Sequence, residues 1–313
     1  MRLEAIAPYD FYLSLDATDT LPHPDMEDEV AEYGLPCPLA LSTREVLVVA
    51  RFVGDDPEAP YFELELPNQD DLSAPEQEEV RGFLGRMLGL DLKNEAFYEA
   101  THGDPVLGPL IEAYHGYVRL STPSLYEAAV REIVFSNIAH APTRQRMLQG
   151  VKERWGAQFD WRGKTYATTP RPSVLRDADP EAFKELKVSR RKGEYIVGLA
   201  KMFDEGELLE PELEAMGHHE FFDTMVGIRG IGPSIAQILM LGRHRPDAAL
   251  IPVDKKGQEW GIRRFVLPMY GLDADELTQQ QSDEALLAWT GFESRACHLT
   301  YLEQRMARLE GRA

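Results

Sequence analysis

Cysteine is scarce in this chain: Cys37 and Cys297 are the only two among 313 residues, and they lie far apart in the sequence. No Cys and His residues have the spacing of a zinc site. Two isolated thiols are typical of reduced core cysteines in a cytosolic protein, whereas a disulfide framework or a zinc site needs more ligands at closer spacing. We therefore expect neither a disulfide nor a bound metal pair.

Long apolar runs and a secretion signal are also lacking. Although 43% of the residues are apolar, no apolar run approaches the roughly 18 residues of a membrane helix. Residues 1–11 have no basic stretch followed by an apolar one, as a secretory signal has. We expect a soluble, cytoplasmic protein with no membrane contact.

Basic residues are outnumbered, since 33 Lys and Arg face 53 Asp and Glu, for a net charge of −20. Taken alone, this balance argues against nucleic-acid binding, because phosphate contacts need local positive charge. The distribution reverses that argument. Residues 1–105 hold 24 acidic and 6 basic residues, whereas residues 119–201 hold 16 basic and 9 acidic ones. The middle of the chain is therefore basic enough to meet DNA.

Hydrophobic patterning predicts a mostly α-helical protein with a small N-terminal α+β domain. Residues 39–53 and 61–66 have the composition of antiparallel strands, and Ser73 with Pro75 starts an apolar-periodic helix that reaches about residue 90. We place this domain at residues 1–105 and a helical core at 106–313. Helices are expected at 124–141, 142–156, 179–187, 189–206, 219–228, 234–241 and within 282–311.

Residues 226–254 carry the most specific pattern of the chain. Gly230 and Gly232 stand two residues apart, and Pro233 suits the first position of the helix that follows. Without a Cβ, glycines let backbone N–H groups approach a ligand, and a helix N-terminus attracts anions. The spacing of a dinucleotide loop fails, because Ile235 stands at the place of its third glycine. A DNA phosphate is the better candidate ligand.

This glycine turn, Asp254 behind Pro252, and aromatic-bearing helices around both resemble the helix-hairpin-helix DNA glycosylases. The 3-methyladenine branch is most similar and the 8-oxoguanine branch second. The resemblance extends over most of the chain, in the right order, through residues 8–11, 117–141, 177–203 and 288–302. It implies the helix-hairpin-helix glycosylase fold and a base-excision repair enzyme that flips a damaged nucleotide out of the duplex.

In such an enzyme the hairpin binds a DNA phosphate without reading sequence. The resemblance assigns this contact to Arg229, Gly230, Gly232 and Ser234. It also implies an alkali cation on the backbone carbonyls of Val226 and Ile228, but no cofactor and no catalytic metal.

Asp254 is the catalytic carboxylate that the resemblance implies. Cleavage of an N-glycosidic bond builds positive charge on the sugar, which a fixed carboxylate stabilises, and the same group orients or deprotonates water. From spacing alone, Asp254 is better explained as the N-cap of the next helix, and both roles are compatible. Bifunctional relatives carry a lysine nucleophile where this chain has Ser234, and Lys255 and Lys256 are not its counterparts. The implied enzyme is monofunctional and leaves an abasic site.

Two further groups of residues are assigned by the resemblance. Ser136, Asn137 and Ile138 form the loop at the gap left by the flipped nucleotide, where Asn137 or Ile138 would enter the base stack. Alternatively, Ile138 is core and Asn137 a turn residue. The base pocket is assigned to Phe292, Trp289, Ile238 and Tyr12, with stacking on a cationic purine as the reason for the aromatics and ordinary core packing as the alternative.

Basic residues of the middle segment are candidates for the phosphate track, with a merely solvated surface as the alternative. They are Arg144, Arg146, Lys152, Arg154, Arg190, Arg191 and Lys192.

The function expected from these residues is a monofunctional DNA glycosylase that acts as a monomer on double-stranded DNA and removes an alkylated purine. Ser234 and Ile238 replace aromatics that alkyl-purine enzymes often carry, so the damaged base stays open. Two alternatives remain, an 8-oxoguanine-type glycosylase and a non-catalytic helix-hairpin-helix protein that binds damaged DNA.

Overall fold

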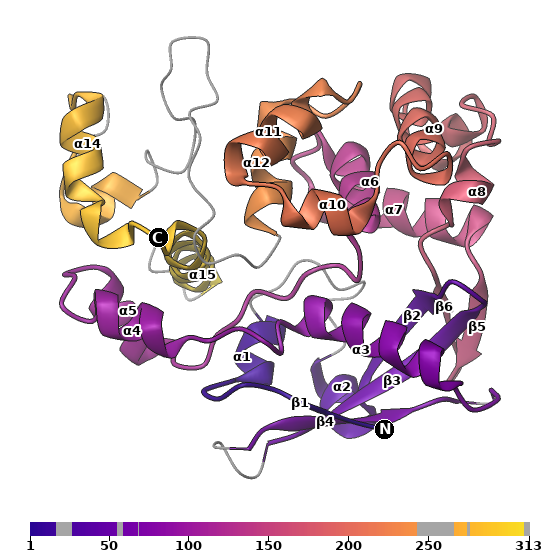
Figure 1. Ribbon diagram of the computed structural model, residues 1–313, viewed down its shortest axis with the longest axis horizontal. Coiled ribbons are helices and arrows are strands. Elements are labelled where there is room, and N and C mark those ends of the chain that lie inside the picture. The colour runs from indigo at the N-terminus through magenta and orange to yellow at the C-terminus, as the bar shows by residue number, and fades with distance from the viewer. Residues whose placement is uncertain (17–26, 55–58, 68, 243–265, 274–275, 310–313) are drawn as a thin grey trace.

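The computed structural model describes residues 1–16, 27–54, 59–67, 69–242, 266–273 and 276–309. Figure 1 shows a sheet at the lower right, a large group of helices above it and a smaller group of helices on the left. This mostly helical architecture with a small sheet confirms the expected fold class. Among the described helices, none combines the length and the apolar character that spanning a lipid bilayer requires.

The sheet near the N-terminus is antiparallel, with the strand order β1-β4-β3-β2. Its strands are β1 (Arg2–Glu4), β2 (Leu35–Ala40), β3 (Glu45–Val53) and β4 (Tyr61–Glu65). The strand predicted over 61–66 is confirmed as β4. The strand predicted over 39–53 is wrong in its start and its middle, because Leu41 N donates to Arg44 O at 2.9 Å in a tight turn between β2 and β3. Two prolines, Pro36 and Pro38, concealed the start of β2, since proline is tolerated in a sheet on an edge strand such as this one.

Helix α3 (Ala74–Leu88) packs on this sheet together with the shorter α1 (Phe11–Asp16) and α2 (Glu27–Tyr33). Ser73 and Glu76 form a capping box at the start of α3, and Gly89 ends the helix in the left-handed conformation with φ 66°. The face turned to the sheet buries Val80, Leu84 and Leu88. The helix predicted after Ser73 is therefore confirmed.

The Glu76 carboxylate links the start of α3 to the β2–β3 turn by hydrogen bonds. Because these bonds need the ionised carboxylate, the stability of the fold is expected to fall in acid. The carboxylate accepts hydrogen bonds from Thr43 Oγ1 at 2.7 Å, from Ser73 N and Oγ at 2.8 Å, and from Arg44 Nε at 2.9 Å. These bonds, that from Thr43 first, lower the pKa of Glu76 from 4.5 to about 2. The stabilisation is complete above the ordinary pKa of 4.5 and is lost as the pH falls towards 2.

Unfolding in urea across this pH range checks the prediction. The wild type is expected to be more stable than Glu76→Gln at neutral pH, and the difference in unfolding free energy is expected to shrink only below the ordinary glutamate pKa of 4.5. A difference that stays constant down to the acid limit would contradict it.

The rest of the chain is mainly helical. The longer helices are α6 (Leu125–Phe135), α7 (Ala141–Trp155), α9 (Arg190–Asp204), α11 (His218–Gly227), α12 (Pro233–Leu241) and α15 (Glu293–Leu309). Shorter elements are α4 (Glu95–Thr101), α5 (Leu107–Ala113), α8 (Pro172–Leu175), η1 (Ala182–Leu186), α10 (Glu210–Ala215), η2 (Leu267–Tyr270), α14 (Gln279–Ala285) and η3 (Leu287–Trp289). The predicted helices at 142–156, 189–206, 219–228 and 234–241 are thereby confirmed.

Three details of this region differ from the prediction. The helix expected over 124–141 ends at Phe135, because Asn137 adopts a left-handed φ of 58° that breaks it. The helix expected over 179–187 is the 3-10 helix η1. A short hairpin, β5 (Gln158–Trp161) with β6 (Lys164–Ala167), was not anticipated within the helical part. Its turn residues Arg162 and Gly163 both have positive φ, at 50° and 76°.

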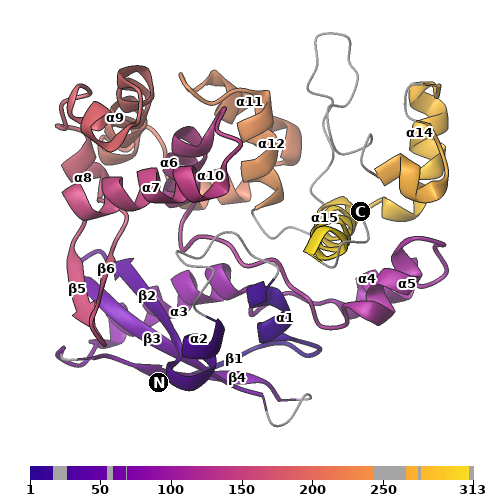
Figure 2. The ribbon, with the colours of Figure 1, turned by 180° about the vertical axis from the view of Figure 1, so that it is seen from behind.

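This hairpin reaches from the helical part to the sheet, where β6 lies beside β2 (Figure 2). One hydrophobic cluster holds buried residues from Leu3 to Leu90 and also Val118, Leu120 and Tyr166. The second cluster runs from Phe97 to Leu302. The division of the chain at residue 105 stays a prediction.

Ion pairs accompany these contacts between the acidic N-terminal part and the basic middle. Lys164 Nζ lies 2.5 Å from Glu29 Oε2, and Arg171 pairs with Glu45. Both cysteines are buried and free, as expected. Burial raises the pKa of each thiol above its usual range.

Candidate nucleic-acid interface

The glycine turn joins α11 to α12. Helix α11 ends at Gly227, and Ile231 N then donates to Ile228 O at 3.0 Å, closing the turn. Gly230 has φ 102°, a conformation that side-chain-bearing residues rarely adopt, and Gly232 is the N-cap of α12 with φ −88° and ψ 172°. The helix-hairpin-helix geometry expected from the sequence is therefore present.

The two glycines serve different needs. A Cβ on Gly230 would stand 2.4 Å from Cγ of Tyr195 on α9, so neither the backbone nor the space admits a side chain there. A Cβ on Gly232 would meet no described atom within 4 Å. The first glycine is required by packing within the protein, whereas the second faces open space.

Helix α12 begins at that open space, and no hydrogen bond to a described residue is made by its first amides. Its first internal hydrogen bond runs from Ala236 N to Gly232 O at 3.0 Å, so the N–H groups of Gly232, Ser234 and Ile235 precede the helical pattern. Ser234 is exposed, and Pro233 removes no bond at the first position. Unpaired amides and the positive end of a helix dipole together favour an anion, so the phosphate contact expected at this helix start stays a prediction.

Arg229 stands beside this turn with a side chain that is 76% exposed. Its Nη2 lies 3.5 Å from Glu194 Oε2, and its guanidinium lies 5.5 Å from the centre of the Tyr195 ring. The arginine is thus held at the turn but remains open to a ligand. Val226 is exposed and Ile228 buried, and the alkali cation on their carbonyls stays a prediction.

The loop between α6 and α7 presents Asn137. Asn137 is exposed at the tip, whereas Ile138 is half-buried and packs against the second hydrophobic cluster. Ser136 Oγ donates to Ile133 O at 2.8 Å, which folds the loop back on the end of α6. Of the two candidates for insertion, Asn137 is therefore the one free to reach a ligand.

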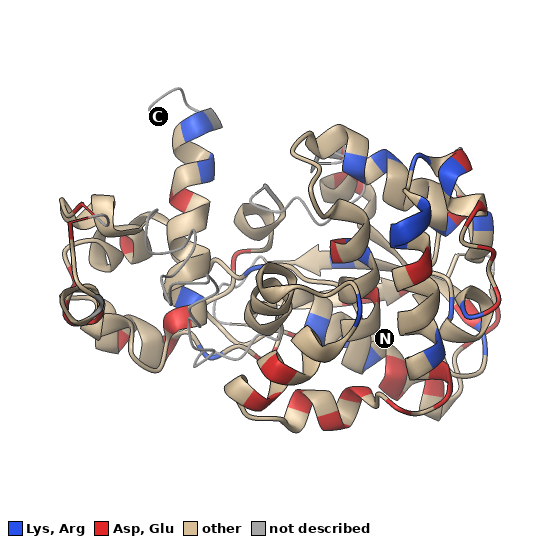
Figure 3. Cartoon of the chain, turned by 90° about the horizontal axis from the view of Figure 1, so that it is seen from above, with Lys and Arg blue, Asp and Glu red and all other residues tan. Residues whose placement is uncertain are grey.

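Figure 3 shows the part of the molecule that holds the sheet and the larger group of helices. In this part, Lys and Arg gather towards one side and Asp and Glu towards the opposite side. Several candidates for the phosphate track are nevertheless engaged by the protein. Lys152 Nζ lies 2.8 Å from Glu127 Oε1, Arg154 Nη1 lies 2.9 Å from Glu185 Oε2, and Arg190 Nε lies 3.1 Å from Glu181 Oε1. Lys192 is turned inward, to backbone carbonyls. From the sequence alone, a basic residue that pairs within the protein could not be distinguished from one that is available to a DNA phosphate.

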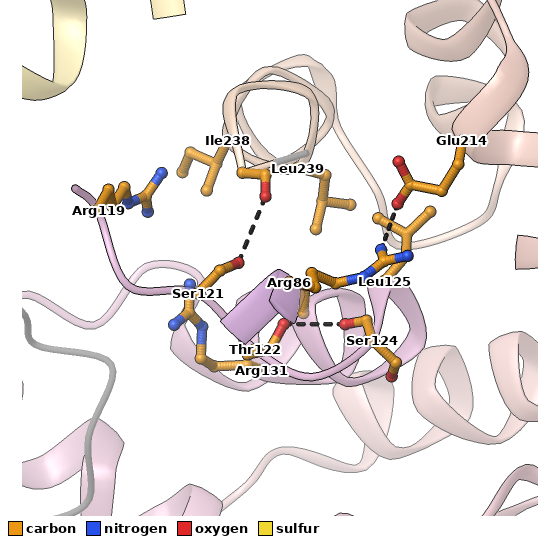
Figure 4. Close-up of a pocket in the computed structure, with 12 residues that line it drawn as sticks. Arg86, Arg119, Ser121, Thr122, Ser124, Leu125, Arg131, Glu214, Ile238 and Leu239 are labelled. Atoms are coloured by element: carbon orange, nitrogen blue, oxygen red, sulfur yellow. Dashed lines mark hydrogen bonds and ion pairs between the residues drawn. The ribbon is translucent and has the colours of Figure 1, made fainter. Parts of the chain in front are cut away.

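Ile238 lies four residues after Ser234, on the same face of α12, and is 37% exposed. It lines a cavity of about 20 Å³ together with Arg119, Ser121 and Arg131 (Figure 4). Arg119 and Ile238 lie at one end of this cavity, and the ion pair of Arg86 with Glu214 lies at the other. The cavity has room for a water molecule but not for a nucleobase.

The three aromatic candidates make their described contacts with residues other than Ile238. Trp289 is 1% exposed, and its Nε1 donates to Tyr270 Oη at 2.9 Å, so it belongs to the core. Phe292 is half-buried with its ring centre 5.7 Å from that of Phe97. Tyr12 is 42% exposed, with its ring centre 5.8 Å from that of Phe52 over the sheet. The place of these three residues in a base pocket stays a prediction.

Asp254, with Lys255 and Lys256, lies outside the described residues. The described helix α12 leads towards this segment, and two serines hold its end. Ser294 Oγ donates to Leu241 O at 3.2 Å, and Ser121 Oγ donates to Gly242 O at 3.3 Å. Sequence reasoning missed both serines, because nothing local marks a hydroxyl that caps a distant helix end.

Known proteins share this arrangement. No family model matches the sequence. The chain is 28% identical over 181 residues to the DNA-3-methyladenine glycosylase of Bacillus subtilis (strain 168), a match that covers 58% of the chain and 59% of that protein. The chain thus matches about three-fifths of the length of this curated relative.

Two solved structures are similar over nearly their whole length. The 3-methyladenine DNA glycosylase from Archaeoglobus fulgidus superposes with a TM-score of 0.75 at 22% identity, covering 98% of each chain. The 8-oxoguanine glycosylase/lyase of Clostridium acetobutylicum, in complex with double-stranded DNA containing cytosine opposite 8-oxoguanine, gives a TM-score of 0.66 at 15% identity, again covering 98% of each chain. The chain is thus similar in sequence to a DNA-3-methyladenine glycosylase, and in fold to solved DNA glycosylases of the 3-methyladenine and 8-oxoguanine types.

Proposed function

We propose that this protein is a monofunctional DNA glycosylase of base-excision repair that removes an alkylated purine from double-stranded DNA. The observation that carries the proposal is the hairpin, where free amides at the start of α12 face open space at Gly232. A DNA phosphate bound there would bring the duplex to the Asn137 loop. The similarity to a DNA-3-methyladenine glycosylase supplies the reaction and favours alkylated purines.

Asp254 is the proposed catalytic residue. As the bond between C1′ and the base nitrogen breaks, the electron pair leaves with the base and positive charge develops on the sugar. The carboxylate stabilises that charge and orients a water molecule, whose oxygen then bonds to C1′. Because a cationic alkylated purine leaves as a neutral base when it takes the electron pair, the proton released by the water passes to the carboxylate and from there to solvent. The products are the free base and an abasic site.

Ser234 argues for this hydrolytic route over a lyase. A strand-cleaving glycosylase needs an amine that attacks C1′ and forms a Schiff base. The serine hydroxyl at the start of α12 cannot form one. The 8-oxoguanine glycosylase/lyase is similar to this chain in fold. Because of Ser234, we do not propose a lyase step for this chain. The enzyme is proposed to act as a cytoplasmic monomer without a cofactor.

Incubation with four duplexes tests the proposal. Each carries one lesion, namely 3-methyladenine, 1,N6-ethenoadenine, hypoxanthine or 8-oxoguanine, and abasic sites are then cleaved with alkali. Excision of an alkylated purine is expected, with strand breaks only after alkali. Breaks without alkali would refute the monofunctional assignment, and preference for 8-oxoguanine would support the other branch. Tight binding without excision on any duplex would identify a damage-binding protein.

A further inference from the structure

The first two turns of α9 contact two elements that the proposed function places on DNA. Lys192 on the first turn reaches the α6–α7 loop, and Tyr195, three residues later, packs against the hairpin. Residues three apart lie on one face of a helix. A single helical face therefore contacts both the loop that carries Asn137 and the turn at Gly230.

The contact with the loop is made by the Lys192 ammonium. Its Nζ donates to Val134 O at 2.8 Å and to Ser136 O at 2.6 Å. These carbonyls end α6, where backbone acceptors lack helical partners and carry the negative end of the helix dipole. A half-buried cation at this place fixes the chain on both sides of Phe135, immediately before Asn137 turns into its left-handed conformation.

The contact with the hairpin is made by the Tyr195 ring. It fills the space in front of Gly230 so closely that no Cβ fits between them. The guanidinium of Arg229, which precedes Gly230, lies 5.5 Å from the centre of the same ring. The hairpin is thus set against α9 by shape, whereas the loop is set against α9 by charged hydrogen bonds.

We propose that Lys192 and Tyr195 are positioning residues that fix the distance between the phosphate-binding hairpin and the Asn137 loop. This rests on the proposed function, because the spacing matters only if both elements engage one duplex. Base flipping requires the phosphate to be held while a side chain enters the gap, so an error of about 1 Å between the two elements costs rate. Lys192 does so without touching the DNA, since its donors are directed at protein carbonyls.

Lys192→Met tests this, because methionine keeps the length of the side chain but removes the ammonium. The single-turnover excision rate from a fully paired duplex is expected to fall about 10- to 100-fold. With the same lesion in a one-nucleotide bulge, where flipping has no pairing to overcome, the rate is expected to stay within about twofold of wild type. The matched control is Lys201→Met, which removes an exposed lysine from the same helix and should change neither rate.

A parallel loss on both substrates with a lowered melting temperature would show a merely structural role and overturn the proposal. An unchanged rate on the paired duplex would overturn it as well. In the double variant with Tyr195→Ala, the rate on the paired duplex is expected to be no lower than in the worse single variant, because both residues act on one spacing. Multiplied losses would show that the two contacts act independently.

A second measurement separates this proposal from the proposed function. A duplex with a tetrahydrofuran abasic analogue opposite 2-aminopurine needs no excision, and entry of Asn137 into the stack unstacks the fluorescent base. Saturating wild-type protein is expected to raise the fluorescence, whereas Lys192→Met and Asn137→Ala lose most of that rise. If no lesion is excised but this pattern holds, the positioning role stands and the enzymatic assignment fails. Equal rises in all three proteins would overturn the positioning role.

Discussion

Replacing Asp254 with asparagine is expected to lower the single-turnover excision rate about 100- to 1,000-fold. The amide keeps the size of the side chain but has no negative charge to oppose the positive charge on the sugar, and it cannot take a proton from water. Affinity for a duplex with an abasic analogue is expected to stay within about twofold, because phosphate contacts dominate affinity.

The matched control is Asp91→Asn, which removes an exposed carboxylate from the N-terminal part and is expected to excise at the wild-type rate. Both variants carry the same change in net charge, so a general electrostatic effect would appear in both. Full activity in Asp254→Asn would leave Asp254 as a helix N-cap alone and would remove the catalytic assignment.

Alanine at the two hairpin glycines is expected to separate folding from DNA binding. In Gly230→Ala the new Cβ stands 2.4 Å from Tyr195 Cγ at φ 102°, so the free energy of unfolding is expected to fall by about 2–4 kcal/mol. In Gly232→Ala the Cβ meets open space in an extended backbone, and stability is expected to change by less than about 0.5 kcal/mol. The same Cβ obstructs a phosphate at the start of α12, which is expected to weaken DNA affinity about tenfold.

Urea unfolding and fluorescence anisotropy with a labelled duplex measure the two effects, and each variant is the control of the other. Gly217→Ala, at the N-cap of α11 where a Cβ also meets no described atom within 4 Å, serves as a third comparison. Wild-type affinity in Gly232→Ala would place the phosphate elsewhere, and the anion site at the start of α12 would have to be abandoned.

Local signals in the sequence predicted much of this fold because their causes are local. The capping box at Ser73 and Glu76 lies within one helical turn, and the glycine turn with Pro233 likewise needs only neighbouring residues. The helix predicted over 124–141 ran past the left-handed Asn137, although a turn at this residue was one of the alternatives, because asparagine inside an apolar-periodic run carries no distinct pattern.

Long-range contacts were the part that the sequence could not supply. Lys192 was a candidate for a phosphate contact until the structure showed its ammonium on carbonyls 56 and 58 residues earlier in the chain. Trp289, a candidate for the base pocket, is buried and donates a hydrogen bond to Tyr270, 19 residues earlier in the chain, a contact that no local pattern indicates. A residue type limits the chemistry that a side chain performs, but the partner that it meets is decided by tertiary packing.

The β5–β6 hairpin has a consequence for how the chain folds as it leaves the ribosome. The cluster under the N-terminal sheet includes Tyr166, and Phe159 and Trp161 pack against it. A nascent chain that has released only the sheet and α3 therefore lacks part of this hydrophobic core. This core is complete only after about half of the 313 residues have been synthesised, so we expect the sheet to reach its full stability only when the basic middle of the chain has emerged.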